Sequence, residues 1–268
     1  VLLVPRIAAA LKASILRGVS ESSRGVRWLG HRALANAARV VSVDHRSRPF
    51  SLRLLMDRLF FRPLVFGRLH KRFGGRLRFF VSGGAPLDLE HQLFFKSLGL
   101  TIYQGYGLTE SSPVISANLP EQHRLGSSGP VLSWLQPDRG GDYVFRDEHG
   151  RVGRQVRGEL LVKGDCVMKG YWRHADVSAK TLHEGWLHTG DMGYVDGDGF
   201  LYLEGRQGNM IVLVGGEKVH PEHVEDAVKA ADIITDAMVI GEACKHIYVL
   251  VNVDPEAVSG LSETEIQR

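Results

Sequence analysis

Cysteine is scarce in this sequence: Cys166 and Cys244 are the only two among 268 residues. They lie far apart in the chain and form no CxxC or metal-ligand spacing, so they cannot build a disulfide framework. Proteins without disulfides are typical of reducing compartments, and the sequence therefore predicts a cytoplasmic location.

Long hydrophobic runs are also missing. No apolar stretch of the sequence approaches the roughly 20 residues that a membrane-spanning helix needs. The opening residues, "VLLVPRIAAALKASI", do not begin with Met and lack the layout of a signal peptide. We therefore expect this segment to come from the middle of a protein.

Acidic residues are rare in the first part of the chain. Residues 1–80 hold 17 lysines and arginines but only 3 aspartates and glutamates, whereas the remainder is net acidic. Such a block is typical of solvated helix faces; the alternatives are a phosphate-rich ligand, an anionic membrane surface or nucleic acid. The basic residues are not interleaved with aromatic ones as base stacking requires, which argues against nucleic acid. Peripheral association with the inner face of a membrane stays open.

The patterns that are present predict an α/β fold. Much of residues 5–72 indicates helices, because apolar residues recur every three or four positions in "IAAALKASIL" and "LRLLMDRLFFRPLVFGRL". "RLRFFVSGGAPL" is typical of a strand that ends in a Gly-Gly turn, with Pro86 opening a helix through "LDLEHQLFFKSLG". "LTIYQGYG" is the next strand, and strand, helix and strand in this order predict a parallel sheet.

After Pro113 the pattern changes to short strands and turns. "DYVFRDEHGRV", "GELLVKG" and "GYVDGDGFLYLEG" indicate a β-rich antiparallel subdomain. From residue 209 onward a strand, a turn, an amphipathic helix and two more strands predict the start of a small α+β domain. We expect the chain to divide into residues 1–205 and residues 206–268, with the hinge at the start of the second part.

The segment "YQGYGLTESSP", residues 103–113, sets glycines and tyrosines beside a Thr-Glu pair directly after a strand. Glycine lets the backbone approach a ligand closely. Tyr106 offers a flat face for a purine, Thr109 a hydroxyl for a phosphate oxygen and Glu110 a hard oxygen for Mg²⁺. Taken alone, the segment fits a nucleotide site or an ordinary glycine-rich turn.

Three further segments accompany this one: "SGGAPL" upstream, and "WLHTGDMGYVDGDGFLYLEGR" and "VGGEKVHPEHVE" downstream. In this order and spacing, the four resemble the adenylate-forming (AMP-binding) superfamily, and within it the acyl-CoA synthetases. "GDCVMKGYW" and "YGLTESSPVISANLP" are most similar to the long-chain fatty acid branch. The resemblance runs over nearly the whole chain, and it implies part of the large α/β domain followed by the start of the small C-terminal domain.

The resemblance also implies roles for individual residues. Gly84, Ala85 and Pro86 would line one side of the adenine, with Gln104, Gly105, Tyr106 and Gly107 on the other. Thr109 would hold the α-phosphate and Glu110 would bind Mg²⁺. Asp191 would accept hydrogen bonds from both ribose hydroxyls, as suits an ionised carboxylate. Arg206 would contact ribose or phosphate at the domain junction, and Gly215 would line the channel for CoA. Thr109, Glu110 and Arg206 are the implied catalytic residues.

The implied activity is the ATP-dependent activation of a fatty acid to acyl-AMP and its transfer to CoA, so the implied substrates are a fatty acid, ATP and CoA. The sequence departs from the family pattern at the hinge, where Gly208, Asn209 and Val212 replace residues that are usually charged. The phosphate loop and the C-terminal catalytic lysine of the family are not among these residues. We therefore expect a fragment of a longer enzyme that is inactive by itself. The alternatives are an adenylating relative that loads a carrier protein, and a truncated non-catalytic protein that binds a nucleotide or acyl group.

Overall fold

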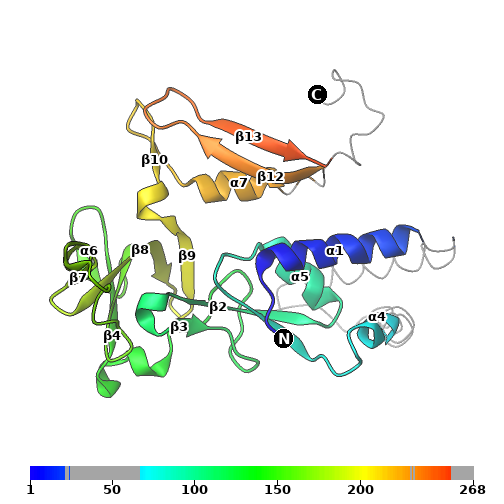
Figure 1. The fold of residues 1–268 in the computed structure, drawn as a ribbon, viewed down its shortest axis with the longest axis horizontal. Coiled ribbons are helices and arrows are strands. Elements are labelled where there is room, and N and C mark those ends of the chain that lie inside the picture. Colours follow the sequence, from blue (N-terminus) through cyan, green and yellow to red (C-terminus); the bar gives the residue numbers. More distant parts are fainter. Residues whose placement is uncertain (22–23, 25–66, 230, 232, 255–268) are drawn as a thin grey trace. The chain divides into compact units, whose positions relative to one another are not determined.

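The structure, a computed structural model, describes residues 1–21, 24, 67–229, 231 and 233–254 (Figure 1). The chain divides into two compact units: Val1–Leu135 with Gly197–Leu201, and Gln136–Asp196 with Tyr202–Arg268. This division groups the β-rich residues with the C-terminal ones, and so differs from the boundary that the sequence motifs suggest at residue 206. That domain boundary stays a prediction.

The first unit is built on a parallel pair of strands. β1 (Phe79–Ser82) pairs in parallel with β2 (Thr101–Gly107), and α5 (Leu89–Ser97) connects the two strands. The predicted strand, helix and strand of a parallel α/β sheet are thereby confirmed. β3 (Val114–Ala117) then pairs antiparallel with the end of β2.

Helix α5 begins later than predicted, and the expectation that Pro86 opens it is wrong. Asp88 has φ −54° and ψ 141°, which is an extended backbone, and the helix begins at Leu89. Before it, Gly84 has φ +86°, in the left-handed region that glycine tolerates. The turn that leaves β1 therefore extends through Asp88, which delays the helix.

Helix α1 (Pro5–Ser20) confirms the predicted helical spacing of the opening residues. Proline suits the first helical position, because an N–H there would have no partner within the helix. Lys12 Nζ lies 2.6 Å from Glu90 Oε1, an ion pair that joins α1 to α5. The core of this unit contains Leu3, Ala8, Phe80, Leu87, Phe95, Leu100 and Ile102.

The predicted helices within residues 25–66 lie outside the described residues. The described end of that stretch is α4 (Gly67–Arg72), which is helical as the pattern predicts. Further along the first unit, η3 (Ser133–Leu135) is a short 3-10 helix.

The second unit contains a six-stranded sheet in the order β5–β4–β6–β8–β7, with β9 paired to β8. The four pairs along this order are antiparallel, as the short strands and turns after Pro113 predict. Phe145, Leu160 and Leu187 are among the fully buried side chains of this sheet. The elements are η4 (Pro137–Arg139), β4 (Asp142–Arg146), β5 (Val152–Gly153), β6 (Gly158–Lys163), α6 (Ala175–Thr181), β7 (Leu182–His183), β8 (Trp186–Val195) and β9 (Leu201–Arg206).

The C-terminal part of the second unit has its own small core of Ile211, Leu213 and Val239. Val224 of the helix packs against this core, which agrees with an amphipathic helix. The predicted strand, helix and two strands are present, and a further short strand, β11, pairs with β10. The elements are η5 (Gln207–Asn209), β10 (Ile211–Val212), β11 (Lys218–Val219), α7 (Pro221–Lys229), β12 (Ile234–Ile240) and β13 (Tyr248–Val253).

Two sequence features can be located directly. Cys166 and Cys244 are both free thiols. Among the helices that the structure describes, none is both long and apolar enough to cross a membrane.

His123 of the first unit is a neutral, partly buried histidine. Its ring packs edge to face against Tyr103, with ring centres 5.1 Å apart. Burial, and after it the positive charge of Lys96, lowers the pKa of His123 from 6.5 to about 4. The unfolded chain therefore takes up this proton at a higher pH than the folded protein does. The associated stability is complete above pH 6.5 and is lost as the pH falls toward about 4.

We expect a His123→Gln variant to lose less of its free energy of unfolding on acidification than the unaltered chain, because glutamine cannot take up the proton. Urea unfolding of both proteins at about pH 7.5 and about pH 5 measures this difference. Because each protein is compared with itself at the two pH values, the loss of the ring contact to Tyr103 in the variant cancels from the difference. Equal losses in the two proteins would show that His123 does not set the acid sensitivity.

Candidate functional site

In the first unit, the two glycine segments lie at the carboxyl ends of neighbouring parallel strands. Ser82, the last residue of β1, is paired with Gln104 of β2. A Cβ placed on Gly83 would lie 3.5 Å from the carbonyl oxygen of Gly105. The structure therefore brings the segment Gly84–Pro86 to the same sheet edge as the segment Gln104–Gly107. In open α/β sheets, ligands bind outside the carboxyl ends of the strands.

Gln104 is engaged inside the unit. It is 8% exposed, and its Oε1 accepts a hydrogen bond from Gln92 Nε2 at 3.0 Å. Its backbone carbonyl accepts from the backbone N–H and from the side-chain amide of Asn118, at 2.9 and 3.1 Å. These bonds fix the end of β2, which gives Gln104 a structural role. Its predicted place beside the adenine stays a prediction.

The presence of glycine at residue 107 has a steric explanation that the sequence did not indicate. A Cβ at this position would lie 1.7 Å from the carbonyl oxygen of Pro113 and 2.8 Å from Cα of Val114. The chain folds back here onto β3, so the contact is with backbone that cannot rotate away. Glycine at residue 107 is required by this close approach, whatever ligand its own backbone faces.

Replacing Gly107 by Ala is therefore expected to destabilise the first unit by about 3 kcal/mol or more, since overpacking against backbone forces β2 and β3 apart. Gly197→Ala is a matched control, because a Cβ there would meet no described atom within 4 Å. Thermal unfolding of the two variants measures the effect. Similar melting temperatures for the two would contradict the steric account.

The Thr-Glu pair lies on η2 (Thr109–Ser111), a tight turn that Ser111 holds in place. Ser111 is fully buried; its hydroxyl donates to the Leu108 carbonyl at 2.9 Å and accepts from the Leu108 N–H at 3.1 Å. Ser112, with φ 53°, ends the turn in the left-handed region. The turn leaves Thr109 exposed and Glu110 partly exposed. The structure thus presents a hydroxyl and a carboxylate side by side at the end of β2.

In the second unit the structure brings Asp191 and Arg206 together. Arg206 Nε at the end of β9 donates to Asp191 Oδ1 on β8 at 3.0 Å. The Asp191 side chain is 10% exposed, whereas that of Arg206 is 60% exposed. A carboxylate has about four lone-pair sites and can therefore accept from several donors at once. Asp191 is therefore suited to accept hydrogen bonds from a polar ligand.

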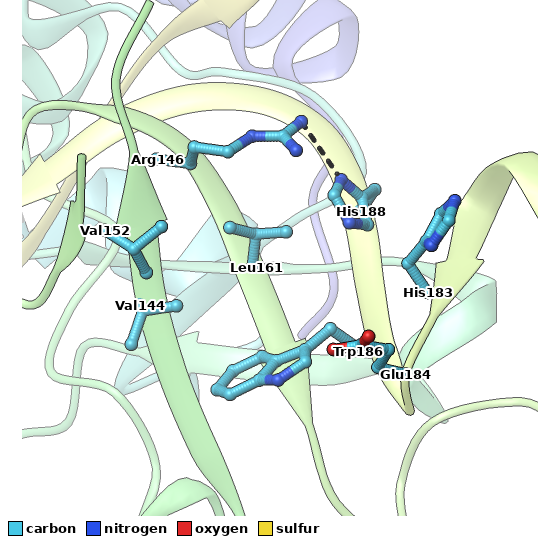
Figure 2. Close-up of a pocket in the computed structure, with 8 residues that line it drawn as sticks. All are labelled: Val144, Arg146, Val152, Leu161, His183, Glu184, Trp186 and His188. Atoms are coloured by element: carbon cyan, nitrogen blue, oxygen red, sulfur yellow. Dashed lines mark hydrogen bonds between the residues drawn. The ribbon is translucent and has the colours of Figure 1, made fainter. Parts of the chain in front are cut away.

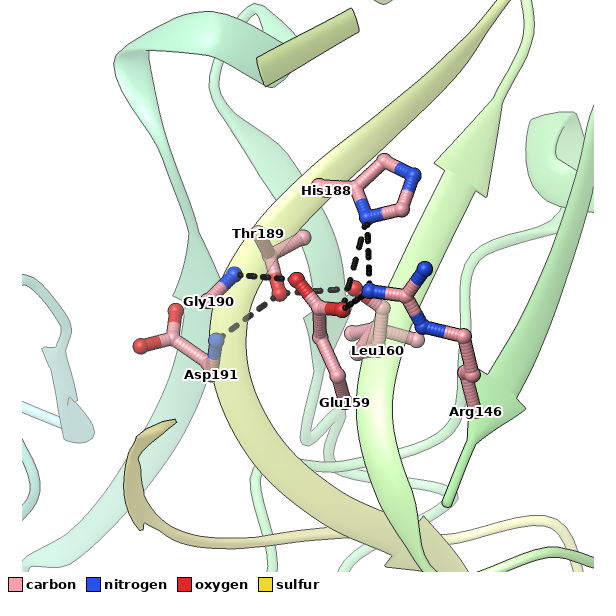
Figure 3. Close-up of polar contacts among 7 residues, drawn as sticks. All are labelled: Arg146, Glu159, Leu160, His188, Thr189, Gly190 and Asp191. Atoms are coloured by element: carbon pink, nitrogen blue, oxygen red, sulfur yellow. Dashed lines mark hydrogen bonds and ion pairs between the residues drawn. The ribbon is translucent and has the colours of Figure 1, made fainter. Parts of the chain in front are cut away.

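Asp191 belongs to a bulge of β8 (Figure 3). Thr189 Oγ1 donates to the carbonyl of Leu160 on β6 at 2.8 Å and accepts from the N–H of Asp191 at 3.1 Å. The Thr-Gly-Asp sequence that carries the resemblance is thus a structural unit. In it, the Thr189 hydroxyl takes the place of a backbone carbonyl as the acceptor for the Asp191 N–H.

Gly215 lies in the turn between β10 and β11, where a Cβ would meet no described atom within 4 Å. Packing of the described residues therefore does not explain glycine at this position. At the predicted hinge, Asn209 Nδ2 donates to Glu222 Oε1 of α7 at 2.9 Å. That bond ties the hinge segment η5 to the first turn of α7.

A shallow cavity of about 450 Å³ lies elsewhere, over the sheet of the second unit (Figure 2). Arg146 and His188 lie at one side of it, with a hydrogen-bonding distance of 3.2 Å between Arg146 Nη2 and His188 Nδ1. The cavity contains none of the predicted site residues. Its lining consists of Val144, Arg146, Val152, Leu161, His183, Glu184, Trp186 and His188.

Comparison with known proteins identifies the family. A family model described as AMP-binding enzyme matches residues 3–172, which is more than half of the chain. The chain belongs to the AMP-binding enzyme family. A second model, described as AMP-binding enzyme C-terminal domain, matches residues 208–268 of this family member. The predicted superfamily is thereby confirmed.

The chain is similar to a curated long-chain-fatty-acid–CoA ligase. The long-chain-fatty-acid–CoA ligase FadD15 of Mycobacterium bovis is 38% identical over 200 residues. This similarity covers 75% of the chain but only 31% of that relative. The chain therefore spans less than a third of the length of that relative.

Solved structures of AMP-binding enzymes share the fold. The O-succinylbenzoate coenzyme A synthetase MenE of Bacillus subtilis, in complex with AMP, matches with a TM-score of 0.58 and 27% identity over 81% of this chain and 46% of that one. The same enzyme in complex with ATP and magnesium ion gives a TM-score of 0.57 and 25% identity, over 81% and 49% of the two chains. The predicted α/β fold of an adenylate-forming enzyme is confirmed.

Proposed function

We propose that this chain is part of a longer long-chain-fatty-acid–CoA ligase. In the first half-reaction, a fatty carboxylate oxygen attacks the α-phosphorus of ATP, which gives acyl-AMP and releases pyrophosphate. In the second, the thiol of CoA attacks the acyl carbonyl and AMP leaves. The activity is supported by the curated relative of that name. In the structure, one observation carries it: both glycine segments and the Thr109–Glu110 turn lie at one edge of the β1–β2 pair.

The proposal gives roles to residues at this edge and to two residues of the second unit. Gly84–Pro86 and Gly105–Gly107 place backbone against the adenine, with Tyr106 offering its ring. Thr109 donates its exposed hydroxyl to the α-phosphate. In the second unit, Asp191 accepts from the ribose hydroxyls and Arg206 contacts ribose or phosphate. The protein acts mainly by positioning and by charge stabilisation, as is usual in phosphoryl chemistry.

Glu110 fits a magnesium ion. It is a carboxylate on a turn that the Ser111 hydroxyl holds and is partly exposed, and carboxylate oxygens are ligands that Mg²⁺ prefers. When bound together with the substrate phosphates, such an ion neutralises their negative charge. Glu110 would supply a protein oxygen to hold it.

The remaining features extend the proposal to CoA, to the domains and to the location. Gly215 borders the path of the CoA thiol, which is supported by the open space at its Cα. Residues 1–205 belong to the large domain, and residues 206–268 are the hinge and part of the small domain. We place the protein in the cytoplasm, with a peripheral contact between the basic residues of the first 80 positions and the inner membrane face as the alternative.

Pyrophosphate exchange with ATP tests the first half-reaction. The full-length protein should exchange labelled pyrophosphate into ATP when palmitate is present, and the 268-residue chain alone should remain at background. Exchange that depends on a short or aromatic acid instead of palmitate would overturn the long-chain assignment. A full-length protein that binds ATP but exchanges no pyrophosphate with any acid would favour a non-catalytic binding protein.

A further inference from the structure

The strand β8 carries an irregularity directly at Asp191. Glu159 of β6 is paired with Met192, and Leu161 is paired with His188. Between these two pairs β6 contributes one residue, Leu160, whereas β8 contributes Thr189, Gly190 and Asp191. The backbone groups of the additional residues cannot all find partners in the ladder, and a buried N–H without a partner is costly.

Two side chains supply the missing partners (Figure 3). The Thr189 hydroxyl accepts from the Asp191 N–H, as described above. The N–H of Gly190 is bound by Glu159 Oε1, at 3.2 Å. Gly190 has φ +71°, in the left-handed region, so the backbone turns at the residue that Glu159 holds.

Glu159 is itself held from its other oxygen. Glu159 is only 4% exposed. Its second carboxylate oxygen, Oε2, lies 2.6 Å from Arg146 Nη2 and 3.4 Å from His188 Nδ1. Arg146 comes from β4 and the Gly190 N–H from β8, so the carboxylate is fixed from both neighbouring strands. Burying a carboxylate is costly unless it has such partners.

We infer that Glu159 is a positioning residue for nucleotide binding: through Gly190 it fixes the bulge that presents Asp191 to the ribose. The inference rests on the proposed contact of Asp191 with the ribose hydroxyls. Glu159 has no contact with the nucleotide in this account. Its effect is confined to the hydroxyls that Asp191 binds.

The test compares ATP with 2′,3′-dideoxy-ATP, which lacks both hydroxyls. Isothermal titration of the full-length protein gives the dissociation constant of each nucleotide. The measured quantity is the ratio of the dissociation constant for dideoxy-ATP to that for ATP. In Glu159→Ala this ratio should fall by about tenfold, because a misplaced carboxylate loses the charge-assisted bonds to the hydroxyls. Affinity for the dideoxy nucleotide should change little. Glu159→Gln keeps an oxygen for the Gly190 N–H but offers a neutral acceptor, so the ratio should fall by about threefold.

Glu204→Gln is the matched control, because Glu204 is also a glutamate of this sheet paired with an arginine, Arg157. Its ratio should equal that of the unaltered protein. If Glu159→Ala does not fold, Glu159→Gln carries the test. A Glu159→Gln ratio equal to that of the control, or equal weakening of both nucleotides, would overturn the inference. Equal binding of the two nucleotides by the unaltered protein would instead overturn the ribose contact of Asp191, and the inference with it.

Discussion

Replacing Glu110 by Gln in the full-length protein is expected to lower the rate of acyl-AMP formation by about 10²–10³-fold. Glutamine is nearly isosteric with glutamate, but its oxygen is neutral and a poor ligand for Mg²⁺. The charge on the phosphates shifts as pyrophosphate leaves, so the loss falls on the transition state of this half-reaction. The turn itself is held by the buried hydroxyl of Ser111 and should stay folded.

The second half-reaction separates this role from a structural one. Thioester formation from supplied acyl-AMP and CoA should lose much less rate in Glu110→Gln, since there is no pyrophosphate charge to neutralise. Glu121→Gln is a suitable control, because Glu121 is an exposed glutamate of the same unit. Equal losses in both half-reactions, or an unchanged dependence on Mg²⁺ concentration, would reduce Glu110 to a residue that shapes its turn.

The second large effect is expected on ATP affinity in Asp191→Ala. Each charge-assisted bond from a ribose hydroxyl is worth about 1.5–3 kcal/mol, so losing the carboxylate should weaken binding by about 10–100-fold or more. Arg206 is largely exposed, and water can replace its lost partner at little cost in stability. Isothermal titration with ATP measures the affinity, and a thermal melt checks the fold. Unchanged affinity in a folded variant would mean that Asp191 serves only the bulge.

The fold was predictable where one local pattern decides it. The apolar spacing of α1 and the strand–helix–strand order around α5 both appear in the structure as predicted. The start of α5 was not predictable from Pro86, because the backbone of Asp88 stays extended until the turn after β1 is complete. Proline marks a position where a helix is able to begin, and the turn decides whether it does.

The candidate site was predictable only in part, because its supporting residues depend on contacts between distant segments. The motifs named Thr109, Glu110 and Asp191, but not Ser111 and Glu159, which hold them. A signal for Glu159 exists in the sequence: a carboxylate stands near the start of the apolar strand "GELLVK", where burial is unfavourable without partners. Its partners Arg146 and Gly190 are supplied by other strands. Likewise, the reason for glycine at residue 107 appears only when β3 folds back against it.

Identification of the products tests the central claim most directly. The full-length protein is incubated with ATP, Mg²⁺, CoA and palmitate, and the products are separated and identified by mass spectrometry. We expect palmitoyl-CoA and AMP in equal amounts, with neither formed when palmitate or ATP is left out. ADP in place of AMP, or AMP release without any thioester, would contradict the assignment of this chain to a fatty-acid–CoA ligase.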